Sequence, residues 1–165
     1  GLPGQTPEDL VRDIDFFLNE NVDMIGMGPY ALHSDTPLGK KPSKSGEENL
    51  RLGLVMIALT RLALKDVNIA ATTALQALDP LGREKGIAAG ANVIMPNLTP
   101  LRYRPLYELY DNKPCLNEGG EVCRDRLENR LRSEGIGIGY GEWGDSPHFR
   151  SKETMAAFPI FEYED

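Results

Sequence analysis

The sequence of 165 residues predicts an α/β fold built on parallel strands. Three short apolar runs carry this prediction, over residues 22–28, 68–74 and 92–97, and helix-like segments alternate with them. Such alternation is typical of right-handed βαβ units in a parallel sheet. Each run ends in residues that suit a binding site, and the carboxyl ends of the strands hold the active site in a β/α barrel. We therefore predict part of a TIM-type β/α barrel, since three or four strands cannot close a barrel of eight.

The helices are predicted from caps and apolar spacing. Thr6 precedes Pro7 and two acidic residues, which is the arrangement of a helix start, and apolar residues recur at helical spacing to about residue 20. A second helix is predicted over residues 45–64 and a third, weaker one over residues 80–90. Residues 29–46 form a long loop, of the kind that is usually functional or disordered. The third strand lacks polar alternation and is expected to be buried on both faces.

The rest of the chain departs from this alternation. Residues 103–110 are expected to form a short helix and residues 120–134 a charged amphipathic one. The glycine-rich residues 135–144 are expected to loop over a surface, and residues 158–165 form either a terminal strand or a disordered end.

Two regions follow from this division. Residues 1–112 are assigned to the C-terminal half of a β/α barrel, and residues 113–165 to a mixed helical and irregular extension that packs on it. The first four residues read as a turn that leaves a strand, so the chain looks cut from something longer. A half barrel has open sheet edges and an uncovered apolar face. We therefore expect the N-terminal half of the barrel, as another segment or a second copy, to complete the fold.

Composition excludes several classes of partner. The net charge of −7 argues against binding to a phosphate backbone, so no nucleic-acid partner is predicted. No apolar stretch reaches membrane-spanning length and the first residues lack signal-peptide character, so no membrane partner is predicted. The cysteines, Cys115 and Cys123, fit two free thiols in a reducing cytosol better than a disulfide scaffold, and a cytoplasmic location is predicted.

Polar residues near the strand ends are candidates for binding. Thr72 and Thr73 can donate hydrogen bonds to a carboxylate or another anion, although threonine is also a common strand residue. Met95 either fills a gap in the core or lines a cavity. Asn97 either binds a ligand or caps the following turn.

Other candidates have equally ordinary interpretations. His33 and Asp35 form either an acid–base or metal pair, or part of a turn. Arg102 and Arg104 either meet an anionic substrate or solvate a helix start. His148 has no partner that the sequence identifies and is expected at the surface. No metal-ligand set is predicted.

Four stretches together resemble radical S-adenosylmethionine enzymes. They are GLPGQTPEDL (1–10), DMIGMGPYALHSDTPL (23–38), NIAATTALQALDPLGRE (68–84) and GANVIMPNLTPLRYRPLYELY (90–110). Within that superfamily the sequence is most similar to the FeFe-hydrogenase maturases of the HydE family, which are relatives of biotin synthase and methylornithine synthase. The resemblance covers most of residues 1–123, with the blocks in the same order and at similar spacing.

The resemblance implies a function and its cofactors. It implies a complete β/α barrel in which a 4Fe-4S cluster cleaves S-adenosylmethionine to a 5'-deoxyadenosyl radical. In HydE-like enzymes this chemistry acts on a small iron–carbonyl–cyanide–cysteine precursor during assembly of the hydrogenase diiron centre. The implied substrate is thus a small organometallic or amino-acid-like molecule bound inside the barrel.

The resemblance also implies roles for particular residues. Substrate binding is assigned to residues at the strand ends and the mouth of the barrel, namely Thr72, Thr73, Met95, Met27, Tyr107 and Tyr110. Binding of the S-adenosylmethionine cofactor is assigned to Gly1, Leu2, Gly4, Val93 and Ile94. No catalytic residue is assigned.

The sequence departs from the family in its cysteines. The Cys-x3-Cys-x2-Cys motif that binds the radical-generating cluster is absent, so its ligands are expected outside this chain. Some relatives carry an accessory cluster on three cysteines near the C-terminus. Cys115 and Cys123 match two of these positions, but Arg126 stands at the third, and no accessory cluster is predicted.

Two alternatives are open at this point. One is a sister synthase of the methylornithine or biotin type, and the other is a non-catalytic domain that binds an anion or a partner protein. A triple-cysteine motif within roughly 120–180 residues upstream would favour an enzyme.

Overall fold

The computed structural model describes residues 1–117 and 119–152, so the prediction for residues 158–165 lies outside the described residues. Helices and short strands alternate in the first half, and helices and turns follow. In chain order the elements are α1 (Pro7–Asn19), β1 (Met24–Ile25), α2 (Gly46–Ala63), β2 (Asn68–Ile69), α3 (Thr73–Leu78), α4 (Gly82–Ala88), the 3-10 helix η1 (Leu101–Tyr107), α5 (Gly120–Ser133) and α6 (Pro147–Ser151).

A small parallel sheet lies at the centre of the fold. β1 pairs with β2 in parallel, with Met24 opposite Asn68 and Ile25 opposite Ile69. A parallel bridge between Ala70 and Val93 adds a third segment beside β2. The predicted α/β class with parallel pairing is therefore confirmed, whereas the described residues do not form half of a barrel.

The strands are much shorter than predicted. The ladder between β1 and β2 is two residues long, and the third segment joins β2 through a single bridge at Val93. The prediction that residues 92–97 are buried on both faces is also wrong, because Met95 is 52% exposed and Pro96 has no N–H to donate to a ladder.

Helices α1 and α2 match their predictions to within two residues at each end. Each begins with a capping box, made by Thr6 with Asp9 in α1 and by Ser45 with Glu48 in α2. The core lies between α2, α3 and the strands, where apolar side chains are almost fully buried. They include Ile25, Ile57, Val67, Ile69 and Leu75.

Helix α3 is where the prediction fails most clearly. The sequence predicts a strand through residue 74, but Thr72 is the N-cap and Thr73 the first residue of a helix. The segment after Thr73 is rich in alanine and leucine, which are strong helix formers. The apolar run therefore contains the end of a strand and the start of a helix, and its composition does not separate them.

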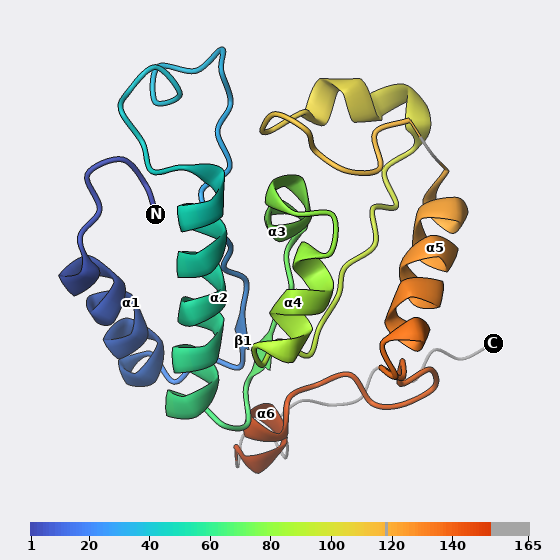
Figure 1. The fold of residues 1–165 in the computed structure, drawn as a ribbon. Helices are drawn as coiled ribbons and strands as arrows, with labels where there is room; N and C mark the ends of the chain where they lie inside the picture. The colour runs from blue at the N-terminus through green and yellow to red at the C-terminus, as the bar shows by residue number, and fades with distance from the viewer. Residues whose placement is uncertain (118, 153–165) are drawn as a thin grey trace.

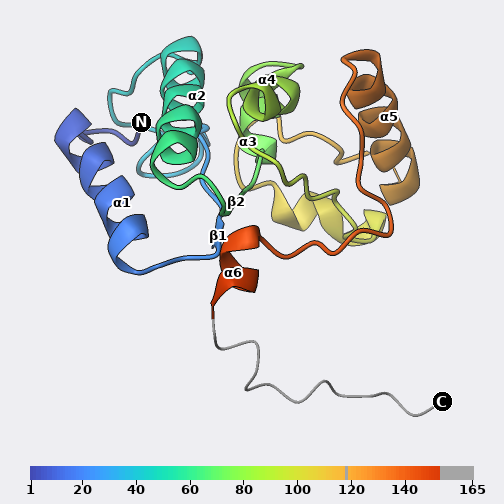
Figure 2. The ribbon, with the colours of Figure 1, turned by 90° about the horizontal axis from the view of Figure 1, so that it is seen from below.

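Helices α1, α2 and α4 stand side by side, and α5 follows α4 at the far side (Figure 1). Viewed from below, these helices lie on one side of β1 and β2, and α6 lies next to the strands (Figure 2). The sequence does not predict α6. Two contacts hold α6 beside the strands. The N–H of His148 donates to the carbonyl oxygen of Asp66 over 3.1 Å, and Lys152 forms an ion pair with Asp23 at 2.7 Å.

His148 lies at the surface, as the sequence predicts, and it has partners that the sequence does not identify. Its Nε2 lies 2.7 Å from Oδ1 of Asn21, and its Nδ1 lies 3.4 Å from Oδ2 of Asp66. Both partners are more than 80 positions away in sequence, which is why no local pattern indicates them.

The cysteines also differ from the prediction. Cys115 and Cys123 form a disulfide, with their Cα atoms 6.1 Å apart, so the expectation of two free thiols is wrong. Cys115 has a left-handed backbone conformation, with φ of 63°, and its partner Cys123 lies in the first turn of α5. The cytoplasmic location stays a prediction, without support from reduced thiols.

Among the described helices, none is both long and apolar enough to cross a membrane.

Candidate functional site

The candidate site lies where β2 gives way to α3. Thr72 has the extended backbone of an N-cap, with φ of −75° and ψ of 158°, but its side chain makes no capping bond. Its Oγ1 atom is buried and has no hydrogen-bond partner in the described part of the chain. Buried hydroxyls are nearly always hydrogen-bonded, so the unpartnered Oγ1 atom makes Thr72 a candidate for binding a ligand or a water molecule.

Thr73, one residue later, contacts a distant tyrosine. Its Oγ1 lies 2.5 Å from the hydroxyl oxygen of Tyr110, which follows η1. Tyr110 is half-buried, and burial raises the pKa of its hydroxyl, while the hydrogen bond with Thr73 and the charge of Arg83 act in the opposite direction. The structure thus brings together two of the residues that the sequence assigns to substrate binding.

The loop that follows β1 approaches Thr72 closely at Gly28. A Cβ atom at Gly28 would lie 2.2 Å from Thr72 Oγ1, so a larger residue cannot stand there without displacing the threonine. Gly28 and Met27 line a cavity of about 280 Å³ together with Gly1, Leu2 and Tyr30. Gly28 therefore both lines this cavity and adjoins the Thr72 hydroxyl.

Of the residues predicted to bind substrate, Met27 alone lines the cavity of about 280 Å³. Met95 is 52% exposed and Tyr107 is 56% exposed, and neither lines the cavity at Met27. Their assignment to substrate binding stays a prediction.

The predicted cofactor residues are divided between two places. Gly1 and Leu2 line the cavity at Met27, and Gly4 lies in the turn that follows them, with a left-handed φ of 86°. Val93 lies in the sheet, and Ile94 lines a second cavity, of about 450 Å³, between α4 and α5. The described residues therefore do not gather these five positions around one cavity.

The structure favours the ordinary interpretation for several other candidates. His33 and Asp35 lie in a turn closed by Thr36 N–H and the His33 carbonyl, and the His33 ring faces Asp111 at 3.9 Å. Asn97 caps a turn by accepting from the N–H of Thr99 over 3.1 Å.

The two arginines differ: Arg102 is exposed at the start of η1, as one of the two alternatives predicts, whereas Arg104 is buried and fits neither alternative. The guanidinium of Arg102 stacks over the Tyr103 ring, 4.6 Å from its centroid. Arg104 is 2% exposed and donates to the carbonyl oxygens of Thr99, Cys115 and Asn97. Arg104 therefore holds the loops after the third strand together.

Sequence reasoning missed a buried charge beside the site. Arg83 is 2% exposed, and its Nε donates to Oε1 of Gln76 over 2.7 Å. Burial lowers the pKa of its guanidinium to about 10. In the sequence Arg83 looks like one of several charged residues at a solvated helix start, and no local pattern distinguishes it.

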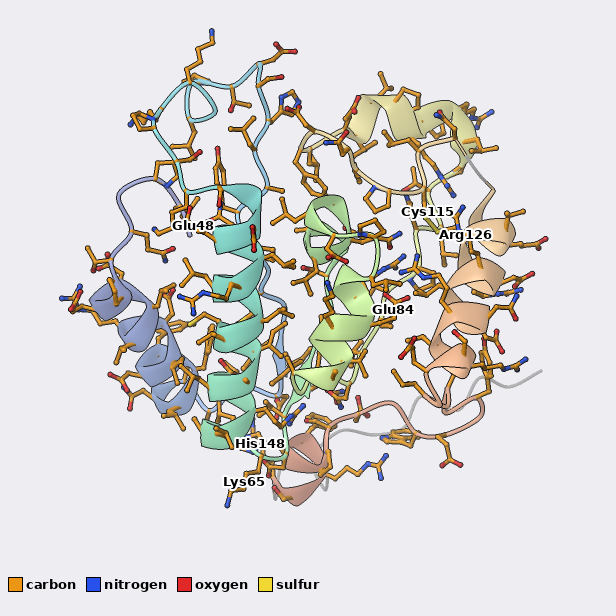
Figure 3. All side chains as sticks on the ribbon, viewed as in Figure 1. Glu48, Lys65, Glu84, Cys115, Arg126 and His148 are labelled. Atoms are coloured by element: carbon orange, nitrogen blue, oxygen red, sulfur yellow. A yellow bond between two sulfur atoms is a disulfide. The ribbon has the colours of Figure 1, made fainter. Side chains whose placement is uncertain are left out.

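The neighbouring acid already has a partner. Glu84 accepts from Nε and Nη2 of Arg130, over 2.6 and 2.7 Å, which links α4 to α5. Figure 3 shows Glu84 and Arg126 between these two helices, and His148 at the opposite end of the molecule from Cys115.

The described residues do not fit a metal cluster. No three His, Cys, Asp or Glu side chains among them converge on one point, and both cysteines are consumed by the disulfide. The absence of an accessory cluster thus stays a prediction, and the 4Fe-4S cluster has no ligand set in this part of the protein.

Comparison with known proteins tests the resemblance to HydE-type maturases that the sequence predicts. No family model matches the chain. The [FeFe] hydrogenase maturase subunit HydE of Thermotoga maritima is 50% identical over 123 residues, which are 74% of this chain and 34% of the relative. The chain therefore spans about a third of the length of the curated relative that it matches. The resemblance to HydE-type radical S-adenosylmethionine proteins is confirmed, and three quarters of this chain are similar to part of such a maturase subunit.

Proposed function

We propose that this chain is part of a HydE-like radical S-adenosylmethionine enzyme that acts in assembly of the FeFe-hydrogenase diiron cofactor. The observation that carries the proposal is the 50% identity to HydE over 123 residues. The position of the candidate site supports it, because Thr72 and Thr73 follow a parallel strand at its carboxyl end, where β/α barrels bind their substrates.

The proposal includes a TIM-type barrel for the whole protein. β1, β2 and the segment at Val93 are neighbours in chain order, are parallel, and are joined by helical connections. Consecutive βα units of a barrel have this order. HydE is about three times as long as the part that this chain matches, so the remaining strands correspond to sequence outside the 123 matched residues.

The proposal places the 4Fe-4S cluster outside these 165 residues, because the described residues do not fit it. We therefore derive no step through the cluster. The residues at the Met27 cavity are proposed to form part of the S-adenosylmethionine site, since Gly1 and Leu2 line that cavity together with Met27.

The chain's own contribution is to bind and orient a small substrate. The buried Thr72 hydroxyl and the Thr73 hydroxyl supply hydrogen bonds to an anionic or carbonyl-type group of the substrate. Gly28 leaves the space that lets the loop after β1 approach Thr72, and the hydrogen bond with Tyr110 holds Thr73 in place. Such a site has few polar groups in a largely apolar setting, which is typical of small-molecule pockets.

Replacement of both threonines tests the proposal. In the double variant Thr72→Val and Thr73→Val, activation of the hydrogenase should be lost while cleavage of S-adenosylmethionine continues. Thr99→Val, which removes a hydroxyl from a loop outside the site, is the control and should retain activation. Full activation by the double variant would remove these hydroxyls from the substrate site.

A further inference from the structure

The buried face of helix α2 meets the loop that follows β1. Residues at helical spacing form this face, namely Asn49, Gly53, Ile57 and Thr60. The Nδ2 atom of Asn49 donates to the carbonyl oxygen of Tyr30 over 3.1 Å. About three turns later, the Thr60 hydroxyl donates to Sδ of Met27 over 3.9 Å. The helix therefore contacts the loop at Met27 and Tyr30, which both line the cavity of about 280 Å³.

Asn49 also contacts the first residue of the chain. A Cβ atom at Gly1 would lie 2.3 Å from Oδ1 of Asn49, so the amide oxygen fills the space that a larger residue would need. The first residues accordingly lie beside the first turns of α2 (Figure 1). Gly1 lines the same cavity as Tyr30, and Asn49 thus joins two segments of its wall.

Stability alone does not explain the burial of Asn49. The residue is 3% exposed, and its Oδ1 atom accepts no hydrogen bond within the described part of the chain. A buried amide oxygen without a donor destabilises a fold. An asparagine at this position therefore indicates a role at the cavity.

We propose that Asn49 is a positioning residue that holds the two segments of the cavity wall at the separation that S-adenosylmethionine needs. It acts through Gly1 and Tyr30, and Thr60 supports the same wall by orienting the Met27 thioether. The inference rests on the proposed function, in which this cavity forms part of the S-adenosylmethionine site.

The expected effect is on binding rather than on the rate of the bound state. Without the amide of Asn49, the loop after β1 keeps fewer contacts with α2. A ligand then has to order this part of the wall when it binds, which lowers its affinity. Once the site is fully occupied the wall is ordered again, so the maximal rate changes little.

Calorimetry on the complete enzyme measures this effect. Asn49→Ala should weaken the affinity for S-adenosylmethionine about fivefold, which corresponds to one neutral hydrogen bond, and should keep the cleavage rate at saturation. Asn68→Ala is the matched control, because Asn68 is 8% exposed, donates from Nδ2 to the Gly144 carbonyl oxygen over 2.9 Å and does not line the cavity. It should lose stability but retain the parent affinity. Unchanged affinity in Asn49→Ala, or an equal loss in both variants, would overturn the proposal.

Thr60 offers a milder change of nearly constant shape. Thr60→Val removes the hydroxyl that faces Met27 and should weaken the affinity by less than Asn49→Ala does. Thr60→Ser keeps the hydroxyl and should restore the affinity, which a purely structural role of the methyl group would not predict. Equal affinities of the valine and serine variants would contradict the role of this hydroxyl.

A stability measurement tests the contact between Asn49 and Gly1 without any cofactor. Gly1→Ala should lower the denaturation midpoint of the parent enzyme, because the added Cβ atom displaces the Asn49 amide. In the Asn49→Ala background the space is free, and the same substitution should have a smaller effect. Equal effects in both backgrounds would overturn the inference. If the parent enzyme binds no S-adenosylmethionine, the proposed function fails, and this comparison still decides whether Asn49 holds Gly1.

Discussion

The guanidinium of Arg104 donates from Nη1 to the carbonyl oxygen of Cys115 over 2.6 Å, and the same side chain reaches the carbonyls of Asn97 and Thr99. One buried side chain therefore joins the end of the third strand segment to the turn before α5. A lysine has the charge but not the planar fork of donors.

Arg104→Lys should lower the free energy of unfolding by about 3 kcal/mol, because at least two of the three buried or partly buried carbonyl oxygens lose their donors. Chemical denaturation measures the change. Arg102→Lys is the matched control, since Arg102 is exposed and stacks on Tyr103, and it should change stability by less than about 1 kcal/mol. Equal stability of the two variants would show that the three carbonyl contacts do not stabilise the fold.

The disulfide between Cys115 and Cys123 closes a short loop in front of α5. Replacement of both cysteines by serine should lower the free energy of unfolding by about 2–3 kcal/mol in the chain-entropy account of cross-links. Thiol labelling of the native protein without reductant provides the direct check and should detect no reactive cysteine. Two labelled thiols under these conditions would instead favour the free cysteines that the sequence predicts.

The contact between Thr73 and Tyr110 should also be visible in stability. Tyr110→Phe and Thr73→Val each remove one partner of the hydrogen bond and should each cost about 1 kcal/mol. Their effects should not add in the double variant, because both remove the same interaction. Tyr103→Phe, at a tyrosine that is 43% exposed, is the control. Additive losses would mean that the two hydroxyls act independently.

The capping carboxylates predict a loss of stability in acid. Hydrogen bonds from the Thr6 backbone and side chain lower the pKa of Asp9, and those from Ser45 lower the pKa of Glu48. A carboxyl group with a lowered folded pKa stabilises the fold above its unfolded pKa, near 4, and this contribution disappears as the pH falls through the folded value. The double variant Asp9→Asn and Glu48→Gln should therefore show a smaller dependence of stability on pH below about pH 4. An identical acid profile in the variant and the parent protein would contradict this origin.

Helices whose caps and apolar spacing lie within one short stretch of sequence can be predicted from that stretch. The caps at Thr6 and Ser45, with the apolar spacing behind them, are sufficient to place α1 and α2. The strands are different, because a strand exists only where a neighbour completes its hydrogen bonds. The apolar run over residues 92–97 predicts a strand from its composition. In the structure this run has a strand-type neighbour only at Val93, where it forms one bridge with Ala70.

The candidate site was predictable only in part. Thr73 and Tyr110 are assigned to substrate binding from family resemblance, and the structure brings them into contact. The burial of Arg83 and the close approach of Gly28 to Thr72 depend on how the chain packs, and a single sequence carries no record of this packing. His148 shows the same limit, since its partners Asn21 and Asp66 are both remote in sequence.

The docking of α6 has a consequence for the integrity of the fold. His148 and Lys152 form hydrogen bonds with Asn21, and Lys152 forms an ion pair with Asp23. β1 is in turn hydrogen-bonded to β2. Cleavage of the backbone within residues 29–45 would therefore leave the first 28 residues attached to the remainder without a covalent link. A protease that nicks this loop should yield two fragments on a denaturing gel and a single particle in native chromatography.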